Sequence, residues 1–435
     1  MTQNTKRLVF SFDGTWNRLD QPCPTNVLLT AESVLPIDGK GIAQLNYYDQ
    51  GVGTGGADYL AGGMLGTGLT ENLADAYLNL VFNYMPGDEI FIFGFSRGAF
   101  SARSFAGLIK NCGVVRREHA SKTKQAIALY QSRRDSDAPW SDKAGAFRAE
   151  YAHPLPEIQY LGVWDTVGAL GIPNHLRLAR LFNGKYRFHD CSLSSMVRSA
   201  RHAVAIDETR RAFEPTLWDN FEALNRAAGK DPEAADAPYQ QKWFPGVHSV
   251  VGGGMPERGL SDQALEWVWA GARQAGLALD TSASSRLYSL NPDYRGPVNG
   301  VAPGGRRPLS DRLWSRSARA NGPQAVHHVS MAARRRWHAA ADELPEKQAY
   351  KPKSLAAVEA AMAADAECQS RPEVPPEGTF EIVVVERGDS LGTIAKHHLG
   401  DPARWKEVYG ANRDKLADPD RIYCGMTLRV PKQTC

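Results

Sequence analysis

The sequence predicts an α/β fold, in which a mostly parallel sheet is flanked by helices and followed by a small C-terminal domain of βααβ order. In the first part of the chain, short apolar runs alternate with segments of helical periodicity. Continuous apolar runs of this length are typical of strands that are buried on both faces, as in a parallel sheet. The expected strands are Leu8–Phe12, Glu89–Phe95, Ile158–Trp164, His202–Ile206 and Lys242–Val247.

Helical patterns lie between and after these runs. In Thr70–Tyr84, apolar side chains recur every three or four residues, Thr70 supplies an N-cap and Pro86 ends the segment. Residues 118–150 form a polar, alanine-containing insertion. The remaining expected helices are Ala99–Lys110, Asp262–Ala270 and 354–367.

A proline-rich stretch, Ser370–Gly378, predicts a boundary between two folded units. We therefore expect three parts. An α/β domain spans residues 1–355, a helix with a proline-rich linker spans 356–378, and a small separate domain spans 379–435.

Composition excludes several classes of function. The net charge is only +3, so no general attraction to nucleic acid is expected. No apolar stretch approaches the ~20 residues that cross a bilayer, and no signal-peptide pattern is found. We expect synthesis in a bacterial cytoplasm and export, if any, by a route without a cleaved signal. The six scattered cysteines predict neither a disulfide framework nor a metal site, and no cofactor is expected.

The segment Gly94–Gly98 matches the pattern G-x-S-x-G, with Ser96 at its centre. A strand runs into the serine and a helix follows it, which is the context that a nucleophile elbow requires. Small residues two positions to either side avoid clashes in that sharp turn. Ser96 is therefore the predicted nucleophile of an α/β-hydrolase-type fold.

Two backbone N–H groups are expected to stabilise the oxyanion. The first belongs to Arg97, which follows the nucleophile at the head of a helix. The second is expected in the loop after the first strand, from Gly14 or Thr15. The neighbouring Asp13 could instead bind a metal or cap a turn, and the sequence leaves that choice open.

A serine nucleophile needs an imidazole base that is oriented by a carboxylate, in the chain order Ser, acid, His. Of eleven histidines, His248 follows a strand and precedes a glycine run, where the last strand should deliver the base. Asp165 and Asp207 each end an earlier strand, so strand counting does not choose between them. His202 lies within a strand run and is expected in the core or behind the site.

Four ordered motifs, FDGTWN, GFSRGAFSAR, GVWDTVGA and FPGVHSVVGGG, resemble the DUF2235 family of α/β-hydrolases over roughly residues 5–355. That family includes phospholipase effectors of bacterial type VI secretion. The resemblance implies a catalytic triad of Ser96, Asp165 and His248, and so favours Asp165 over Asp207. Where the family has an aspartate two residues after the histidine, this chain has Val250.

The resemblance implies a serine hydrolase that cleaves glycerophospholipid acyl esters, a phospholipase A1 or A2 that acts as an antibacterial effector. It also implies a membrane surface as partner, secretion-spike and immunity proteins as further partners, and delivery into a target-cell periplasm. Basic and aromatic residues in 175–188 and 306–336 suit an anionic lipid surface, or alternatively form a solvated face. Because of Val250, the competing hypothesis is a weak or inactive adaptor that docks peptidoglycan or a secretion component.

Residues 380–431 resemble a LysM domain, a module that binds N-acetylglucosamine-containing glycans such as peptidoglycan. Asp389 or Ser390 is expected to cap its first helix. The alternative is that the domain's loops merely build turns and the domain docks protein. The resemblance places the glycan-binding residues at Gly388, Asp389, Ser390, Leu391, Arg421, Ile422 and Tyr423.

Overall fold

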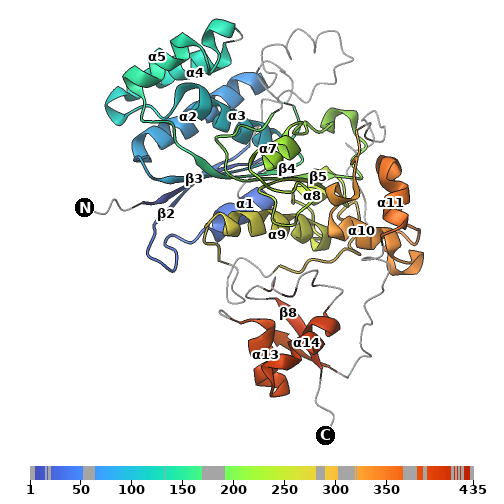
Figure 1. Ribbon diagram of the computed structural model, residues 1–435. Helices are drawn as coiled ribbons and strands as arrows, with labels where there is room; N and C mark the ends of the chain where they lie inside the picture. The colour runs from blue at the N-terminus through green and yellow to red at the C-terminus, as the bar shows by residue number, and fades with distance from the viewer. Residues whose placement is uncertain are drawn as a thin grey trace.

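The N-terminal domain is built on a six-stranded parallel sheet with the strand order β2-β1-β3-β4-β5-β6. Helices cover both faces of the sheet (Figure 1). The predicted α/β architecture is therefore confirmed. The computed structural model describes residues 5–14, 17, 21–51, 64–132, 134–168, 192–280, 290–301, 319, 321–365, 380–385, 389–412, 416, 419, 422 and 426–431.

The central strands lie close to where the sequence predicts them, whereas one edge strand was missed. β2 was not predicted, because QLNYYD is partly exposed at the sheet edge and so lacks a continuous apolar run. β5 and β6 each begin a few residues before their predicted starts. The strands are β1 (Arg7–Phe12), β2 (Gln44–Asp49), β3 (Glu89–Phe95), β4 (Ile158–Trp164), β5 (Ala200–Ala205) and β6 (Tyr239–Phe244).

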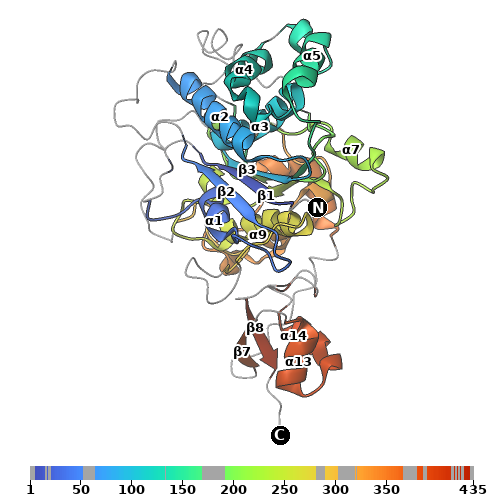
Figure 2. The same ribbon diagram turned by 90° about the vertical axis from the view of Figure 1, so that its left-hand side faces the viewer.

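One face of the sheet is covered by α2 (Met64–Asn83) and α3 (Arg97–Cys112), with the insertion packed outside them (Figure 2). The expectation that Thr70 caps α2 is wrong, because the helix begins at Met64 and continues through Thr70. The insertion consists of short elements rather than long helices. They are η1 (Arg117–Lys122), α4 (Thr123–Gln131), η2 (Asp135–Asp137) and α5 (Asp142–Tyr151).

The opposite face is covered by α1 (Asn26–Ser33) and α9 (Gly259–Gln274). Successive strand side chains enter opposite cores, as the two-residue period of a strand requires. Phe10 packs with the α2 and α3 side, whereas Val9 packs with the α1 and α9 side. The sheet is thus sandwiched between two apolar layers, and its polar chemistry is restricted to its ends.

Beyond β6, a third apolar cluster joins the sheet to the segment that follows α9. Trp243 of β6 pairs with Val329 in an isolated parallel bridge. The helix predicted over 354–367 is interrupted, because Val358 leaves helical geometry between a 3₁₀ turn and a short α-helix. The elements here are η5 (Val326–His328), α10 (Met331–His338), η6 (Ala341–Glu343), η7 (Lys353–Val358) and α11 (Glu359–Ala363).

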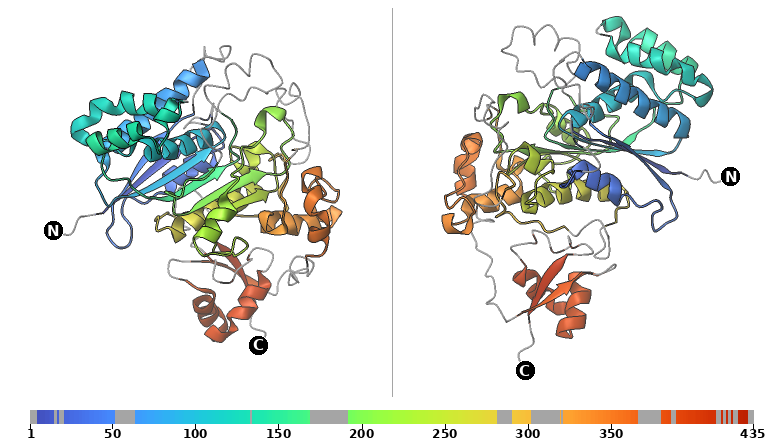
Figure 3. Two further views of the ribbon diagram at one scale, coloured as in Figure 1. Left: turned by 45° about the horizontal axis from the view of Figure 1, so that its top comes forward. Right: turned by 180° about the vertical axis from the view of Figure 1, so that it is seen from behind.

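The C-terminal domain has the predicted βααβ order, with an antiparallel strand pair beside two helices (Figure 3). Its core contains Leu391, Ile394 and Val408. The proline-rich stretch 370–378, like residues 366 and 367, lies outside the described residues. The elements are β7 (Phe380–Val384), α13 (Leu391–Leu399), η8 (Pro402–Arg404), α14 (Trp405–Ala411) and β8 (Thr427–Pro431).

Among the described helices, none combines the length and the apolar character that crossing a lipid bilayer demands.

Candidate active site

Ser96 sits in a strained turn between β3 and α3. Its backbone has φ 58° and ψ −122°, a conformation that non-glycine residues rarely adopt. The turn packs so closely that a Cβ on Gly98 would lie 2.2 Å from the carbonyl oxygen of Phe12, and one on Gly94 would lie 2.5 Å from the Gly98 carbonyl. Both glycines are therefore needed to build this elbow, as the G-x-S-x-G pattern indicated.

The ends of three strands bring Ser96, Asp165 and His248 together. The Oγ atom of Ser96 lies 2.8 Å from Nε2 of His248, and the other ring nitrogen, Nδ1, lies 2.6 Å from Oδ2 of Asp165. All three residues are buried. Ser96 follows β3, Asp165 follows β4, and His248 opens the short helix α8 (His248–Val251) after β6. These distances match the geometry that a serine nucleophile, an imidazole base and an orienting carboxylate require.

The competing acid, Asp207, takes no part in this arrangement. Its Oδ2 atom accepts hydrogen bonds from the Gly246 N–H at 2.6 Å and from the Tyr350 hydroxyl at 2.8 Å. Burial raises the pKa of Asp207 to about 6. Its contacts tie the end of β5 to the loop before α8 and to the segment that leads into η7.

His202 supports the site from behind. Its Nε2 atom accepts a hydrogen bond from the Thr166 N–H at 3.2 Å, and its Nδ1 atom lies 2.9 Å from the Gln241 side chain. Burial lowers the pKa of His202 to about 3, so the ring is neutral under ordinary conditions. It thereby fixes the backbone directly after Asp165.

Arg319 contacts the site, and sequence reasoning missed it. Its two terminal nitrogens donate to the two carboxylate oxygens of Asp165 at 2.7 and 2.8 Å. The Ala205 N–H donates to Oδ1 as well, at 2.9 Å. Burial alone would raise the pKa of Asp165, but the Arg319 charge and the His248 hydrogen bond hold it well below its ordinary value. No local pattern pointed to Arg319, because it belongs to an arginine-rich stretch that predicted only a lipid-facing or solvated surface.

The imidazole of His248 is held between two aromatic rings. The ring centroids of Phe95 and Phe213 lie 4.7 and 4.6 Å from its own. Its backbone N–H donates to the Glu208 carboxylate at 3.1 Å, and Glu208 pairs with Arg210 at 2.7 Å. Burial lowers the pKa of His248 against the opposing effect of Asp165. At neutral pH the ring is therefore uncharged and able to accept a proton.

The predicted oxyanion donors have different surroundings. Arg97 is the first residue of α3, where amide groups are not used by the helix's own hydrogen bonds. Gly14 lies beside the nucleophile, since a Cβ on it would be 3.4 Å from Cβ of Ser96. However, its N–H donates to Oδ1 of Asp13 at 2.6 Å, so this group is already engaged. The alternative donor, Thr15, lies outside the described residues.

Asp13 organises the loop after β1. Its carboxylate accepts hydrogen bonds from Gly14, from the Asn17 amide, from the Thr25 hydroxyl at 2.6 Å and from the Tyr48 hydroxyl at 2.8 Å. Burial raises its pKa. With these donors around it, Asp13 acts as a cap for the loop, the second of the two roles that the sequence left open.

Val250, which departs from the family pattern, is completely buried. It packs so closely against Gly246 and Gly300 that a Cβ on either glycine would lie within 3 Å of the valine side chain. The hydrogen bonds that join Ser96, His248 and Asp165 are present without a carboxylate at this position.

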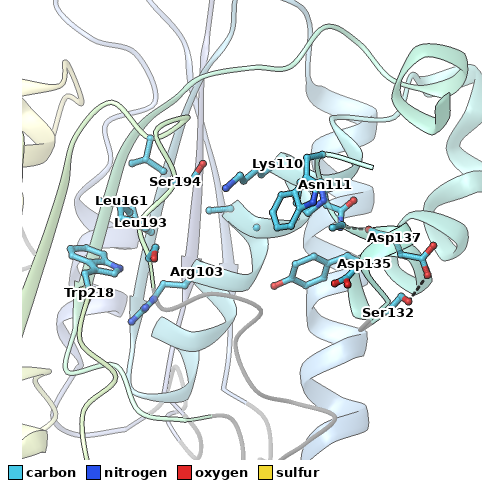
Figure 4. A pocket seen from close by; sticks show the side chains of 18 of the residues that line it. Arg103, Lys110, Asn111, Ser132, Asp135, Asp137, Leu161, Leu193, Ser194 and Trp218 are labelled. Carbon is cyan, nitrogen blue, oxygen red and sulfur yellow. Dashed lines mark hydrogen bonds between the residues drawn. The ribbon is translucent and has the colours of Figure 1, made fainter. Parts of the chain in front are cut away.

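A cavity of about 340 Å³ lies on the α3 side of the sheet (Figure 4). Its walls include Arg103 and Lys110 of α3, Leu161 of β4 and Trp218. Ser96, Asp165 and His248 do not line it. The cavity is thus separate from the hydrogen-bonded serine, and we assign it no role in the chemistry.

In the C-terminal domain, the predicted glycan-binding residues that are described also serve the domain's own fold. Ser390 caps α13 by accepting from the Thr393 N–H at 3.1 Å, and Asp389 accepts from the Thr393 hydroxyl at 3.2 Å. Leu391 lies in the small core, and Ile422 packs against it. Their role in glycan binding stays a prediction. Outside the described residues lie Gly388, Arg421 and Tyr423.

Comparison with protein families gives two matches. Residues 6–271 match the model of the type VI secretion (T6SS) phospholipase effector Tle1-like catalytic domain, and residues 383–431 match the LysM domain. The second match agrees with the fold of the C-terminal domain.

Two curated proteins are similar to parts of the chain. The uncharacterized protein YEL023C of Saccharomyces cerevisiae is 30% identical over 230 residues, which is 48% of this chain and 32% of that protein. The potassium binding protein Kbp of Escherichia coli O6:H1 is 33% identical over 58 residues, 13% of this chain and 39% of Kbp. The chain thus spans 32% of the length of the first relative and 39% of the length of the second.

Two solved structures are similar at lower identity. An uncharacterized protein from Pseudomonas aeruginosa is 21% identical with a TM-score of 0.35, covering 63% of this chain and 46% of its own. A Tle1 effector, solved bound to the VgrG spike of the type VI secretion system, is 20% identical with a TM-score of 0.33, covering 58% of this chain and 52% of its own.

Proposed function

Because the chain belongs to the Tle1-like catalytic domain family of type VI secretion phospholipase effectors, we propose that it hydrolyses glycerophospholipid acyl esters with a Ser96–His248–Asp165 triad. The observation that carries the proposal is the unbroken hydrogen-bonded chain from the Ser96 hydroxyl through both nitrogens of His248 to the Asp165 carboxylate. Its position at the carboxyl ends of parallel strands is where open α/β sheets bind ligands.

In the proposed reaction, His248 accepts the hydroxyl proton while Ser96 Oγ attacks the ester carbonyl carbon. The tetrahedral oxyanion is stabilised by the Arg97 N–H at the positive end of α3. Collapse breaks the bond to the glycerol oxygen, which leaves with the proton from His248 as a lysophospholipid, and the acyl group stays on Ser96 Oγ. Water, deprotonated by the same imidazole, then attacks the acyl carbonyl. The bond to Oγ breaks, Ser96 takes back the proton from His248, and the fatty acid is released. Asp165 keeps the ring oriented and stabilises its charged form.

For the C-terminal domain we propose binding to N-acetylglucosamine-containing glycans, with peptidoglycan as the natural ligand. The proposed layout is a catalytic part over residues 1–355, a helix with a proline-rich linker over 356–378 and a glycan-binding part over 379–435. Val358 and Met362 of the second part pack in the apolar cluster with β5 and β6. Binding to the cell wall would retain a secreted lipase close to the membranes that it attacks.

Delivery by a type VI system into a target-cell periplasm fits the family. We therefore propose a secretion-spike protein and a cognate immunity protein as partners. An anionic phospholipid surface is the proposed site of action. Of the two segments proposed to face it, 175–188 lies outside the described residues, as does most of the first half of 306–336. In the described part of 306–336, Arg319 and Arg336 are buried and paired with Asp165 and Glu346, so the expectation that they face lipid is wrong.

The first experiment measures fatty-acid release from mixed phosphatidylethanolamine and phosphatidylglycerol vesicles by wild type and Ser96→Ala. Vesicles with a labelled acyl chain at one glycerol position distinguish A1 from A2 cleavage. We expect release by wild type and near-complete loss in the variant. Ser101→Ala, which alters another buried serine of α3, is the matched control and should retain activity.

The competing proposal, an inactive adaptor, is favoured by Val250 alone. It predicts no release by wild type from any vesicle or from a panel of soluble esters, together with sedimentation of the full chain with peptidoglycan. Cleavage of short-chain soluble esters without phospholipid cleavage would support a hydrolase that acts on a different class of ester.

A further inference from the structure

Two neighbouring histidines meet a glutamate on the β6 side of the N-terminal domain. His327 and His328 form most of η5, and Glu222 lies in the first turn of α7 (Phe221–Ala227). All three residues are partly buried, and one donor atom from each lies within 4.8 Å of the others. Imidazole nitrogens with a carboxylate oxygen are a donor set that Zn²⁺ prefers.

The spacing of the donor atoms suits a single small ion. Oε1 of Glu222 lies 3.0 Å from Nε2 of His328 and 3.8 Å from Nε2 of His327. Ligands at about 2.0–2.1 Å from a tetrahedral zinc are roughly 3.4 Å apart, midway between these two values. Movements of a few tenths of an ångström would therefore bring the Glu222 oxygen to the tetrahedral spacing from both imidazole nitrogens.

One donor atom lacks a hydrogen-bond partner of its own. Nε2 of His327 is buried and makes no hydrogen bond to any described residue, since the Glu222 oxygen is too distant for one. Leaving a buried polar atom unsatisfied is costly, and such atoms require a specific explanation. A metal ion between the two rings and the carboxylate would satisfy it.

The surroundings resemble the outer ligand shell of a zinc site. The second oxygen of Glu222 accepts a hydrogen bond from Arg226 at 2.8 Å. Oε1 of Glu233 lies 3.7 Å from Nδ1 of His327, which is near the ring but beyond hydrogen-bond distance. Carboxylates behind imidazole ligands, and donors behind carboxylate ligands, orient the atoms that bind the metal.

We propose that Glu222, His327 and His328 bind one zinc ion, with water as the fourth ligand. The ion would fasten η5, which leads into the bridge with β6, to α7, which precedes β6 in the chain. Because the binding residues are distinct from Ser96, Asp165 and His248, the proposal does not depend on the hydrolase function.

The test uses the full chain after treatment with a chelator and dialysis. Metal content per chain is measured by mass spectrometry after exposure to one equivalent of ZnCl₂, and the thermal midpoint is followed during a ZnCl₂ titration. We expect one zinc per chain and a midpoint that rises by several degrees, because a ligand that binds only the folded state stabilises it. Co²⁺ in place of Zn²⁺ should give the intense visible absorption of a tetrahedral site.

Three variants locate the ion: Glu222→Gln, His328→Gln and the double change His327→Gln with His328→Gln. Each should keep the apo midpoint near that of wild type and lose the zinc-dependent rise. His119→Gln, a histidine of η1 away from the cluster, should bind zinc as wild type does. Failure of wild type to retain zinc, or retention of one zinc by the double variant, overturns the proposal.

Discussion

Replacing Arg319 by glutamine tests whether a buried guanidinium sets the working pH of the proposed triad. The change removes a positive charge and the bidentate contact with Asp165, in a place where the two side chains are 2% and 0% exposed. Asp165 would retain two donors, the Ala205 N–H and the His248 ring. Glutamine can still donate one hydrogen bond, so the charge is the principal loss.

The expected effects follow from burial. Breaking a buried ion pair by removing one partner typically costs about 3–5 kcal/mol of folding free energy. The second effect acts on His248, because Arg319 disfavours the protonated ring. Removal of this positive charge from beside Asp165 should raise the pKa of His248. The base acts in its neutral form, and the acidic limb of kcat/KM should therefore move to higher pH.

The assay is the pH dependence of kcat/KM on a soluble ester, which avoids changes in the vesicle surface, with unfolding measured in urea alongside. At a pH below both acidic limbs, the activity of the variant should fall about tenfold for each pH unit by which its limb has moved. The charged groups that act on His248 besides Asp165 include Glu208 and Arg210, and they are unchanged in the variant. Arg319→Lys keeps the positive charge but loses the bidentate contact with Asp165. The acidic limb of its pH profile should therefore stay near that of wild type while its rate falls.

Arg198→Gln is the matched control, because this arginine pairs with Glu157 on the surface, where both side chains are more than half exposed. Its effect on stability should be within about 1 kcal/mol, and its pH profile should be unchanged. Wild-type stability together with a wild-type acidic limb in Arg319→Gln would contradict both expectations.

Four further expectations can be checked separately. Asp165→Asn should lower kcat/KM by roughly 10³–10⁴-fold, whereas Asp207→Asn should leave ester hydrolysis near wild type, because only Asp165 contacts the imidazole. Gly252→Ala should lower both activity and melting temperature, by about 1–3 kcal/mol in stability, because its Cβ would lie 1.9 Å from the Phe95 ring that packs on His248. His202 has a folded pKa of about 3 against an ordinary 6.5, so folding stability falls by about 1.4 kcal/mol per pH unit as the pH drops from 6.5 toward 3. His202→Gln should therefore reduce the difference between the unfolding free energies measured in urea at pH 7 and at pH 4.5. An unchanged difference would contradict this. Ser390→Ala removes the cap of α13 and should destabilise the C-terminal domain by about 1 kcal/mol, seen in its denaturation curve but not in ester hydrolysis.

The sequence predicted the structure best where one physical requirement produces a local sequence pattern. Burial on both faces makes strands such as β3 and β4 appear as apolar runs, and the close packing of the turn at Ser96 requires two glycines that no larger residue could replace. The edge strand β2 has no such requirement, because one side of it faces solvent. Its position is set by pairing with β1, which no local pattern reveals.

The site was less predictable where it depends on distant contacts. Asp165 and Asp207 end adjacent strands and look alike in sequence, but only Asp165, with φ 38°, contacts the histidine. Arg319 is 154 residues from its partner, and nothing nearby in the sequence distinguishes it from the other arginines. Similarly, the engagement of the Gly14 N–H by Asp13 depends on a loop geometry that the residues alone leave open.

The Asp165–Arg319 pair also bears on how this protein could be recombined. The region shared with its family ends at residue 271, and it contains the serine, the aspartate and the histidine. The guanidinium of Arg319, which neutralises the aspartate, lies beyond residue 271. Val329, Leu355 and Met362, which pack against β5 and β6, lie beyond it as well. A chimera joined at residue 271 would inherit the serine, the aspartate and the histidine together with an uncompensated negative charge in its interior. The smallest segment that can be exchanged between relatives as a working unit therefore extends at least to the end of α11.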